Sequence, residues 1–86
     1  MHTQHNGVEL KVVQDDDRSA EIHVALDCGT ARVSVYGPRT RFGQNVPAQV
    51  NWSAIGSVGK DDALRYAAAI SYAAQFAADW KAEGAS

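Results

Sequence analysis

The 86-residue sequence has a single cysteine, Cys28, and no long run of hydrophobic residues. One cysteine excludes an intramolecular disulfide and a zinc site built on a cysteine cluster. No apolar stretch reaches the roughly 18 residues that a membrane-spanning helix needs. The N-terminus, MHTQHNGVEL, lacks the apolar segment of a signal peptide. These absences predict a cytoplasmic protein of one domain that does not associate with membranes.

Acidic residues are absent from residues 31–60, although the chain as a whole has a formal net charge of −2. That segment carries four basic residues, which are Arg32, Arg39, Arg41 and Lys60. Seven of the ten acids lie in the run Asp15–Asp17 and on or beside the C-terminal segment. The net negative charge argues against a general binder of polyanions, while residues 31–60 form a local positive field.

Alternation of apolar and polar side chains predicts four β-strands, over residues 8–12, 20–26, 31–36 and 50–54. A tight connection at Asp27–Thr30 indicates that consecutive strands pair as an antiparallel meander. Residues 1–6 are polar and are expected to be a flexible tail, with the domain spanning residues 7–86. Residues 37–47 contain two prolines and two glycines and are expected to form a long loop with no regular strand.

From Lys60 the apolar spacing becomes helical, and one face collects Tyr66, Ile70, Ala73, Ala77 and Trp80, with Ala69 and Phe76 on its flank. Asp61 and Asp62 suit the first turn of this helix, Gly59 or Ser57 its N-cap, and Gly84 its end. The predicted fold is α+β: a four-stranded antiparallel β-meander followed by one C-terminal α-helix packed on one face of the sheet. Trp52 and Trp80 are expected to be buried.

The stretch VNWSAIGSVGKDDALRYAAAISYAAQFA resembles the C-terminal part of small uncharacterised proteins of actinobacteria and their phages. In those proteins an Asn-Trp-Ser segment and a Gly-Ser turn lead into an alanine-rich helix. The matching residues here are Asn51, Trp52, Ser53, Gly56 and Ser57. The resemblance covers about the last third of the chain and implies a phage or mobile-element origin, with no activity attached. Those proteins often have Ser or Thr before the helix, where this chain has Gly59.

Residues suited to catalysis or ligand binding are few. His23 lies among charged residues on the outward side of a predicted strand, and Cys28 has no histidine near it in sequence to stabilise a thiolate. Asp15–Asp17 lacks the alternating ligands of a calcium loop. Gly56–Lys60 departs from the phosphate-loop pattern, and Asp61 after it would repel a phosphate. The sequence therefore predicts no enzyme, no catalytic residue, no metal site and no cofactor.

The segment YGPRTRFGQN, residues 36–45, combines two aromatic residues with two arginines. Arginine and large aromatic side chains are enriched at the energetic centres of protein interfaces. Arginine can also hold a carboxylate or phosphate through two parallel hydrogen bonds. Two interpretations remain open. The segment is either a contact surface, or a connection in which Tyr36 and Phe42 cover a small core while the arginines point into solvent.

We hypothesise a small non-enzymatic protein-interaction module whose partner-binding residues are Tyr36, Arg39, Arg41, Phe42 and Arg32. The resemblance implies that this protein is a phage or mobile-element accessory protein that binds and inhibits a host protein. The alternative is a small nucleic-acid-binding protein that uses the basic segment 31–60, including Lys60. The net charge favours a protein partner, because nucleic-acid-binding domains usually carry a broad basic stripe.

Self-association is a further hypothesis. Leu64 and Tyr72 fall on the predicted outer side of the helix, with alanines between them. Exposed apolar residues gathered on one helix face are typical of a docking surface. These two residues therefore predict a homodimer seam.

Overall fold

The computed structural model describes residues 1–15, 18–27, 29–52 and 57–80. Within these residues the chain forms strands β1 (His2–His5), β2 (Val8–Gln14), β3 (Ser19–Leu26), β4 (Gly29–Tyr36), β5 (Arg39–Arg41), β6 (Gln44–Val46) and β7 (Gln49–Trp52), followed by helix α1 (Lys60–Asp79). Expectations that fall on Asp16, Asp17, Cys28, residues 53–56 and Gly84 lie outside the described residues.

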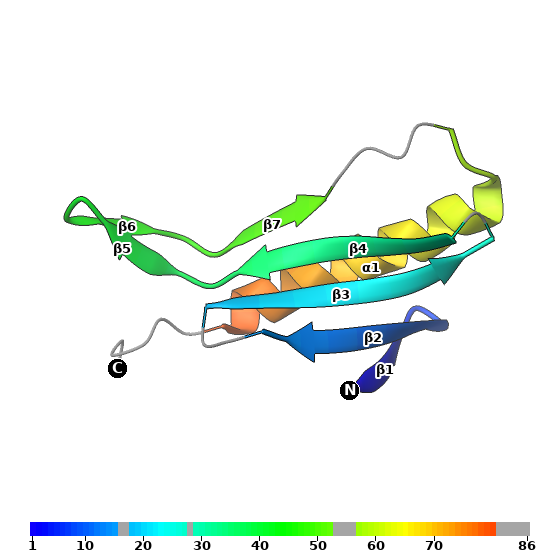
Figure 1. The fold of residues 1–86 in the computed structure, drawn as a ribbon, viewed down its shortest axis with the longest axis horizontal. Coiled ribbons are helices and arrows are strands. Elements are labelled where there is room, and N and C mark those ends of the chain that lie inside the picture. Colours follow the sequence, from blue (N-terminus) through cyan, green and yellow to red (C-terminus); the bar gives the residue numbers. More distant parts are fainter. Residues whose placement is uncertain (16–17, 28, 53–56, 81–86) are drawn as a thin grey trace.

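Five strands form one antiparallel sheet in the order β1-β2-β3-β4-β7, and α1 lies across one face of it (Figure 1). The strand register runs straight across the sheet: Lys11 pairs with His23, and His23 pairs with Arg32. The predicted α+β fold, a β-meander followed by a helix on one face, is confirmed. None of the helices in the described segments is long and apolar enough to cross a membrane.

The core lies between α1 and the inward side chains of β2, β3 and β4. Its largest fully buried side chains are Leu10, Ile22, Val24, Val33 and Val35. Each fully buried aliphatic side chain of this size contributes about 1.5–3 kcal/mol relative to exposure. Across from them the helix presents Ala69 and Ala73, which are also fully buried. Small alanines allow a close approach of helix to sheet, and the flanking aromatic residues supply the remaining volume.

The N-terminus differs from the sequence prediction. Residues 2–5 form edge strand β1, in which His5 pairs with Val8 and His2 pairs with Lys11. The two residues between the strands, Asn6 and Gly7, have φ values of 52° and 78°. Two consecutive positive φ values are typical of a type I′ turn, and Asn-Gly is its preferred sequence. A strand therefore stands where a flexible tail was expected.

Residues 37–47 also differ from the expected loop. They contain a second hairpin, β5–β6, in which Arg39 pairs with Val46 and Arg41 pairs with Gln44. The prolines do not prevent this, because Pro38 precedes the first strand and Pro47 follows the second. The prediction that no strand passes through this segment is wrong.

The two tryptophans have different environments. Trp80 is half-buried and packs against the core, whereas Trp52 is 51% exposed. Trp52 lies on β7, which is an edge strand. Among the described strands, β7 pairs only with β4. An edge position gives a large side chain few neighbours. The expected burial of Trp52 is therefore wrong, whereas Trp80 packs against the core on the predicted helix face.

The predicted outer position of Tyr72 is also wrong. Its ring packs against the core and makes an edge-on contact with the His5 ring, with centroids 5.7 Å apart. Beside it, the His5 Nε2 and Ser71 Oγ atoms are 3.0 Å apart and share a hydrogen bond. Strand β1 thus covers a side of α1 that would face solvent if residues 1–6 were a tail. Leu64 remains 68% exposed.

Asp62 anchors the start of α1 to the β3–β4 connection. Its side chain is buried, and both carboxylate oxygens accept the backbone N–H of Asp27, at 3.0 and 3.2 Å. Arg65 donates to Asp62 Oδ1 at 2.9 Å and to Asp27 Oδ1 at 3.2 Å. The hydrogen bond to Asp27, followed by the charge of that residue, raises the pKa of Arg65. Asp62 therefore joins the start of α1 to the β3–β4 connection, in addition to complementing the helix dipole.

Replacing Asp62 by alanine should lower the free energy of unfolding by about 1.5–3 kcal/mol, the range for hydrogen bonds to charged groups. Asp61 is a matched control, because it occupies the same helical turn but is exposed. Asp61→Ala should cost only about 0.3–1 kcal/mol through the helix dipole. Urea denaturation of both variants measures the difference. Equal losses would show that the contacts of Asp62 with Asp27 and Arg65 add nothing.

Candidate functional site

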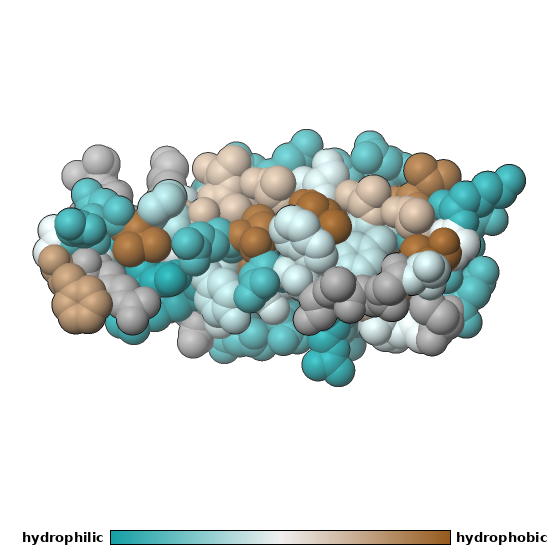
Figure 2. Space-filling view, turned by 90° about the horizontal axis from the view of Figure 1, so that it is seen from above, coloured by the Kyte–Doolittle hydropathy of each residue, from teal (hydrophilic) through white to brown (hydrophobic). Residues whose placement is uncertain are grey.

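The β5–β6 hairpin extends beyond the end of β4, away from the layer formed by the sheet and helix (Figure 1). At its tip, between β5 and β6, Phe42 is 91% exposed. Figure 2 shows hydrophobic colouring at this left-hand end of the molecule, among hydrophilic neighbours. The hairpin therefore presents a large aromatic side chain to solvent. The interpretation in which Phe42 covers the core is wrong.

The backbone of the hairpin tip is unfavourable for the residue that occupies it. Phe42 has a φ of 52° and Gly43 has a φ of 75°, the same pattern of two positive values as in the β1–β2 turn. That turn uses Asn6, which tolerates the left-handed region. A bulky residue such as phenylalanine with positive φ costs about 1–2 kcal/mol. Asn or Gly at position 42 would avoid this local backbone cost.

A hollow of about 380 Å³ lies at the base of the hairpin and is lined by Arg18, Ser19, Tyr36, Gly37, Arg39 and Gln49. Arg39 Nη2 donates to Gln49 Oε1 at 3.4 Å, which links β5 to β7. The backbone N–H of Gly37 donates to the Arg18 carbonyl at 2.7 Å. Two arginines and a tyrosine thus border one concave surface.

The structure brings together only some of the predicted partner-binding residues. Tyr36 and Arg39 share the hollow, and Arg41 precedes Phe42 at the end of β5. Arg32 lies four residues before Tyr36 on β4, where it is exposed and pairs with His23. Lys60 begins α1 at the end of the molecule opposite the hairpin (Figure 1). The basic residues of segment 31–60 therefore do not form one continuous surface.

Sequence reasoning missed Arg18, which joins this surface from the β2–β3 connection. The register of the β3–β4 hairpin places Ser19 opposite Tyr36, and hence Arg18 beside Gly37. A turn over Asp27–Thr30 would place Arg18 opposite Arg39, whereas the observed pairing of Leu26 with Gly29 shifts the register by two residues and places Arg18 opposite Gly37.

Gly37 fixes the hairpin base against the helix. A Cβ at this position would lie 2.9 Å from Cε2 and 3.0 Å from Nε1 of the Trp80 indole. Real Cβ atoms essentially never approach another atom this closely, and the indole is rigid. The absence of a side chain at Gly37 therefore allows Trp80 to pack directly on the backbone from which the hairpin starts.

Gly37→Ala should destabilise the protein by about 1–3 kcal/mol, the usual cost of overpacking. Thermal unfolding followed by tryptophan fluorescence measures it. The same substitution in a Trp80→Leu background should cost clearly less, because the clashing ring is gone. An equal cost in both backgrounds would show that the indole contact is not the cause.

Other chemistry in the described part of the chain is sparse. His23 Nε2 and Glu21 Oε1 form a hydrogen-bonded pair at 2.9 Å on the outer sheet face. Among the described residues no group of three His, Cys, Asp or Glu side chains could hold a metal ion. The described geometry is therefore richest in potential contact groups at the β5–β6 hairpin.

Comparisons of this chain with protein-family models, curated proteins and solved structures gave no match.

Proposed function

We propose that this protein is a small non-enzymatic interaction module that binds a partner protein through the β5–β6 hairpin. The observation that carries the proposal is Phe42: an aromatic side chain, 91% exposed, at a position whose backbone conformation disfavours it. Residues held in sparsely populated backbone conformations are concentrated at functional sites. Exposed aromatic residues become energetic anchors when a partner buries them.

The partner presents an acidic surface. Arg18, Arg39 and Tyr36 border the hollow at the hairpin base. Arginine at an interface holds carboxylates through paired hydrogen bonds, and tyrosine adds contact area at a low entropy cost. The strands that border the hollow carry two further arginines in sequence, Arg41 in β5 and Arg32 in β4.

A protein partner is favoured over a nucleic acid. Lys60, which the nucleic-acid hypothesis needs, lies at the opposite end of the molecule from the hairpin (Figure 1). The chain also has a net charge of −2. Without a broad basic stripe, phosphate contacts would be few and non-specific affinity low.

The resemblance to actinobacterial and phage proteins extends the proposal to a biological role. The protein acts in the cytoplasm as a phage or mobile-element accessory protein that occupies a functional surface of a host protein. A chain of 86 residues is large enough to present one interface and needs no active site for such inhibition.

Affinity capture with paired baits tests the proposal. Wild type and Phe42→Asn, immobilised in parallel, are exposed to a lysate of the source organism, and bound proteins are quantified by mass spectrometry. The expected result is an acidic protein that the wild type retains and Phe42→Asn loses. An Arg39→Ala/Arg41→Ala bait should lose the same protein. Retention of identical proteins by all three baits would refute binding through the hairpin.

A further inference from the structure

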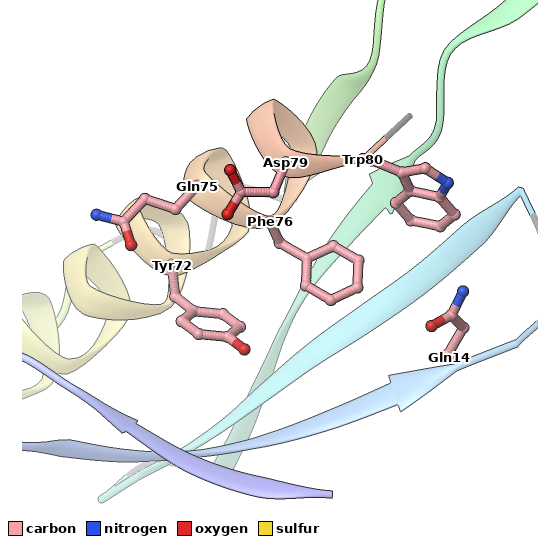
Figure 3. A pocket seen from close by; sticks show the side chains of 6 residues that line it. All are labelled: Gln14, Tyr72, Gln75, Phe76, Asp79 and Trp80. Carbon is pink, nitrogen blue, oxygen red and sulfur yellow. The ribbon is translucent and has the colours of Figure 1, made fainter. Parts of the chain in front are cut away.

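A second concave surface lies on the other side of Trp80 from the proposed hairpin site. It is a hollow of about 470 Å³ lined by three aromatic residues and three polar ones: Tyr72, Phe76, Trp80, Gln14, Gln75 and Asp79. Figure 3 shows the three rings projecting from α1 toward the sheet, with Gln14 facing them from β2. We define this surface as the aromatic hollow.

The ring walls of the aromatic hollow are held in place by neighbouring side chains. Tyr72 and Phe76 are four residues apart on one face of α1, and Trp80 follows the helix as its C-cap, with an extended backbone. Phe76 and Trp80 meet edge-on at 5.3 Å between centroids, and Tyr72 meets Phe76 at 6.3 Å. His5 holds Tyr72 from β1, and Gly37 lies against Trp80. The aromatic surface is therefore already formed before any ligand binds.

Asp79 gives this surface a negative charge. Its carboxylate is exposed, and in the described part of the chain it makes no ion pair. It is the last residue of α1, where the helix dipole disfavours an acid, and no basic residue occupies the last turn. The position of Asp79 therefore brings no benefit to helix stability. In Figure 3, Asp79 and Gln75 extend from α1 above the rings of Tyr72 and Phe76.

We propose that the aromatic hollow binds an arginine side chain of a partner polypeptide. The faces of aromatic rings attract cations, and a guanidinium stacks on such faces more readily than an ammonium does. Asp79 can accept two of its N–H groups, and the side-chain carbonyl of Gln75 offers a further acceptor. Because the hollow is open along one side, it suits a side chain supplied by a polypeptide better than a small ligand that needs enclosure.

This inference goes beyond the proposed function, because it concerns a different surface and the opposite charge. The hairpin presents arginines to acidic groups, whereas the aromatic hollow presents an acid and π faces to a basic group. The two proposals can be tested independently, because substitutions at Phe42 and at Asp79 change different surfaces.

Peptide titration tests the inference. In a Trp52→Phe background, Trp80 is the remaining tryptophan and reports on the hollow. The blocked peptide Gly-Arg-Gly is titrated to millimolar concentration against its citrulline analogue, which has the same shape without the charge. We expect a saturable change in Trp80 fluorescence with the arginine peptide, and at least about tenfold weaker binding of the citrulline peptide.

Two charge variants make the test specific. Asp79→Asn should weaken binding of the arginine peptide by about tenfold or more while leaving the protein at least as resistant to urea, because it removes an acid from the helix C-terminus. Asp61→Asn removes the same charge at the exposed start of α1 and should leave binding unchanged. Absence of binding, equal binding of the two peptides, or equal effects of the two variants would overturn the inference.

Discussion

Trp80→Ala should cost about 3 kcal/mol of stability and lower the melting temperature by about 12–24 °C. The estimate takes the lower end of the range for Trp→Ala, because the indole is half-buried. The variant removes the edge-on contact with Phe76 and the packing on Gly37. A domain of this size has a total stability on the order of 5 kcal/mol, so a substantial fraction of molecules would unfold on mild heating.

Trp52→Ala is the control for this loss. It also removes an indole, but from an exposed site on edge strand β7. Its expected cost is about 1 kcal/mol or less, in line with substitutions of exposed residues. Differential scanning calorimetry of both variants gives the comparison. Equal decreases in melting temperature would contradict the assignment of Trp80 to the structural core.

Phe42→Asn should weaken binding of the captured partner by about 2 kcal/mol or more, which is roughly thirtyfold in Kd. The same substitution should raise the stability of the free protein by up to about 1 kcal/mol, because asparagine tolerates the positive φ that phenylalanine resists. Asn6 already occupies the equivalent position of the β1–β2 turn. Calorimetric titration and thermal melting of one preparation measure both effects.

Opposite signs for affinity and stability distinguish a binding residue from a structural one. If Phe42 were a structural residue, its replacement would lower the melting temperature first, and binding would fall only as a consequence. A Phe42→Asn protein that binds normally would refute the role of the hairpin tip. A variant with weaker binding and a lower melting temperature would show that Phe42 is a structural residue.

The main fold could be predicted because its elements are long and partly buried. Strands β2, β3 and β4 alternate apolar and polar residues over seven or eight positions, and the core uses the apolar set. Helix α1 spans 20 residues, enough for its apolar face to show clearly. The Gly59 N-cap was also among the two predicted candidates.

The short elements escaped prediction for physical reasons. Strand β1 has four residues and lies at the sheet edge, so polar side chains such as His2 and Gln4 face solvent and give no apolar alternation. Its sequence signal was the turn Asn6-Gly7. Strands β5 and β6 have three residues each, too few for a period to appear. Their shared turn places phenylalanine where asparagine is usual, which concealed it.

The missing β1 explains the error at Tyr72. Helical spacing alone places Tyr72 on the outer side of the helix, and whether solvent or protein covers that side depends on a strand distant in sequence. Because His5 supplies the cover, Leu64 and Tyr72 do not form one exposed seam. Self-association remains a prediction, but its proposed surface is reduced to Leu64 and exposed neighbours.

The candidate site could be predicted in position but not in shape. Composition located the aromatic and basic residues at 36–45, whereas the exposure of Phe42 and the strain at its φ angle required the backbone. The participation of Arg18 required the register between β3 and β4. Long-range pairing of this kind carries no local sequence signal beyond the turn that sets it.

A nuclear magnetic resonance titration of this protein with the captured partner tests most directly whether the hairpin is the binding surface. The partner, unlabelled, is titrated into 15N-labelled protein, and backbone amide signals are followed residue by residue. We predict that signals of residues 36–46 and Arg18 shift or broaden first, while those of Lys11, Glu21 and His23 on the outer sheet face change little. Changes confined to the outer sheet face around Lys11, Glu21 and His23, with the hairpin signals unaffected, would contradict the account.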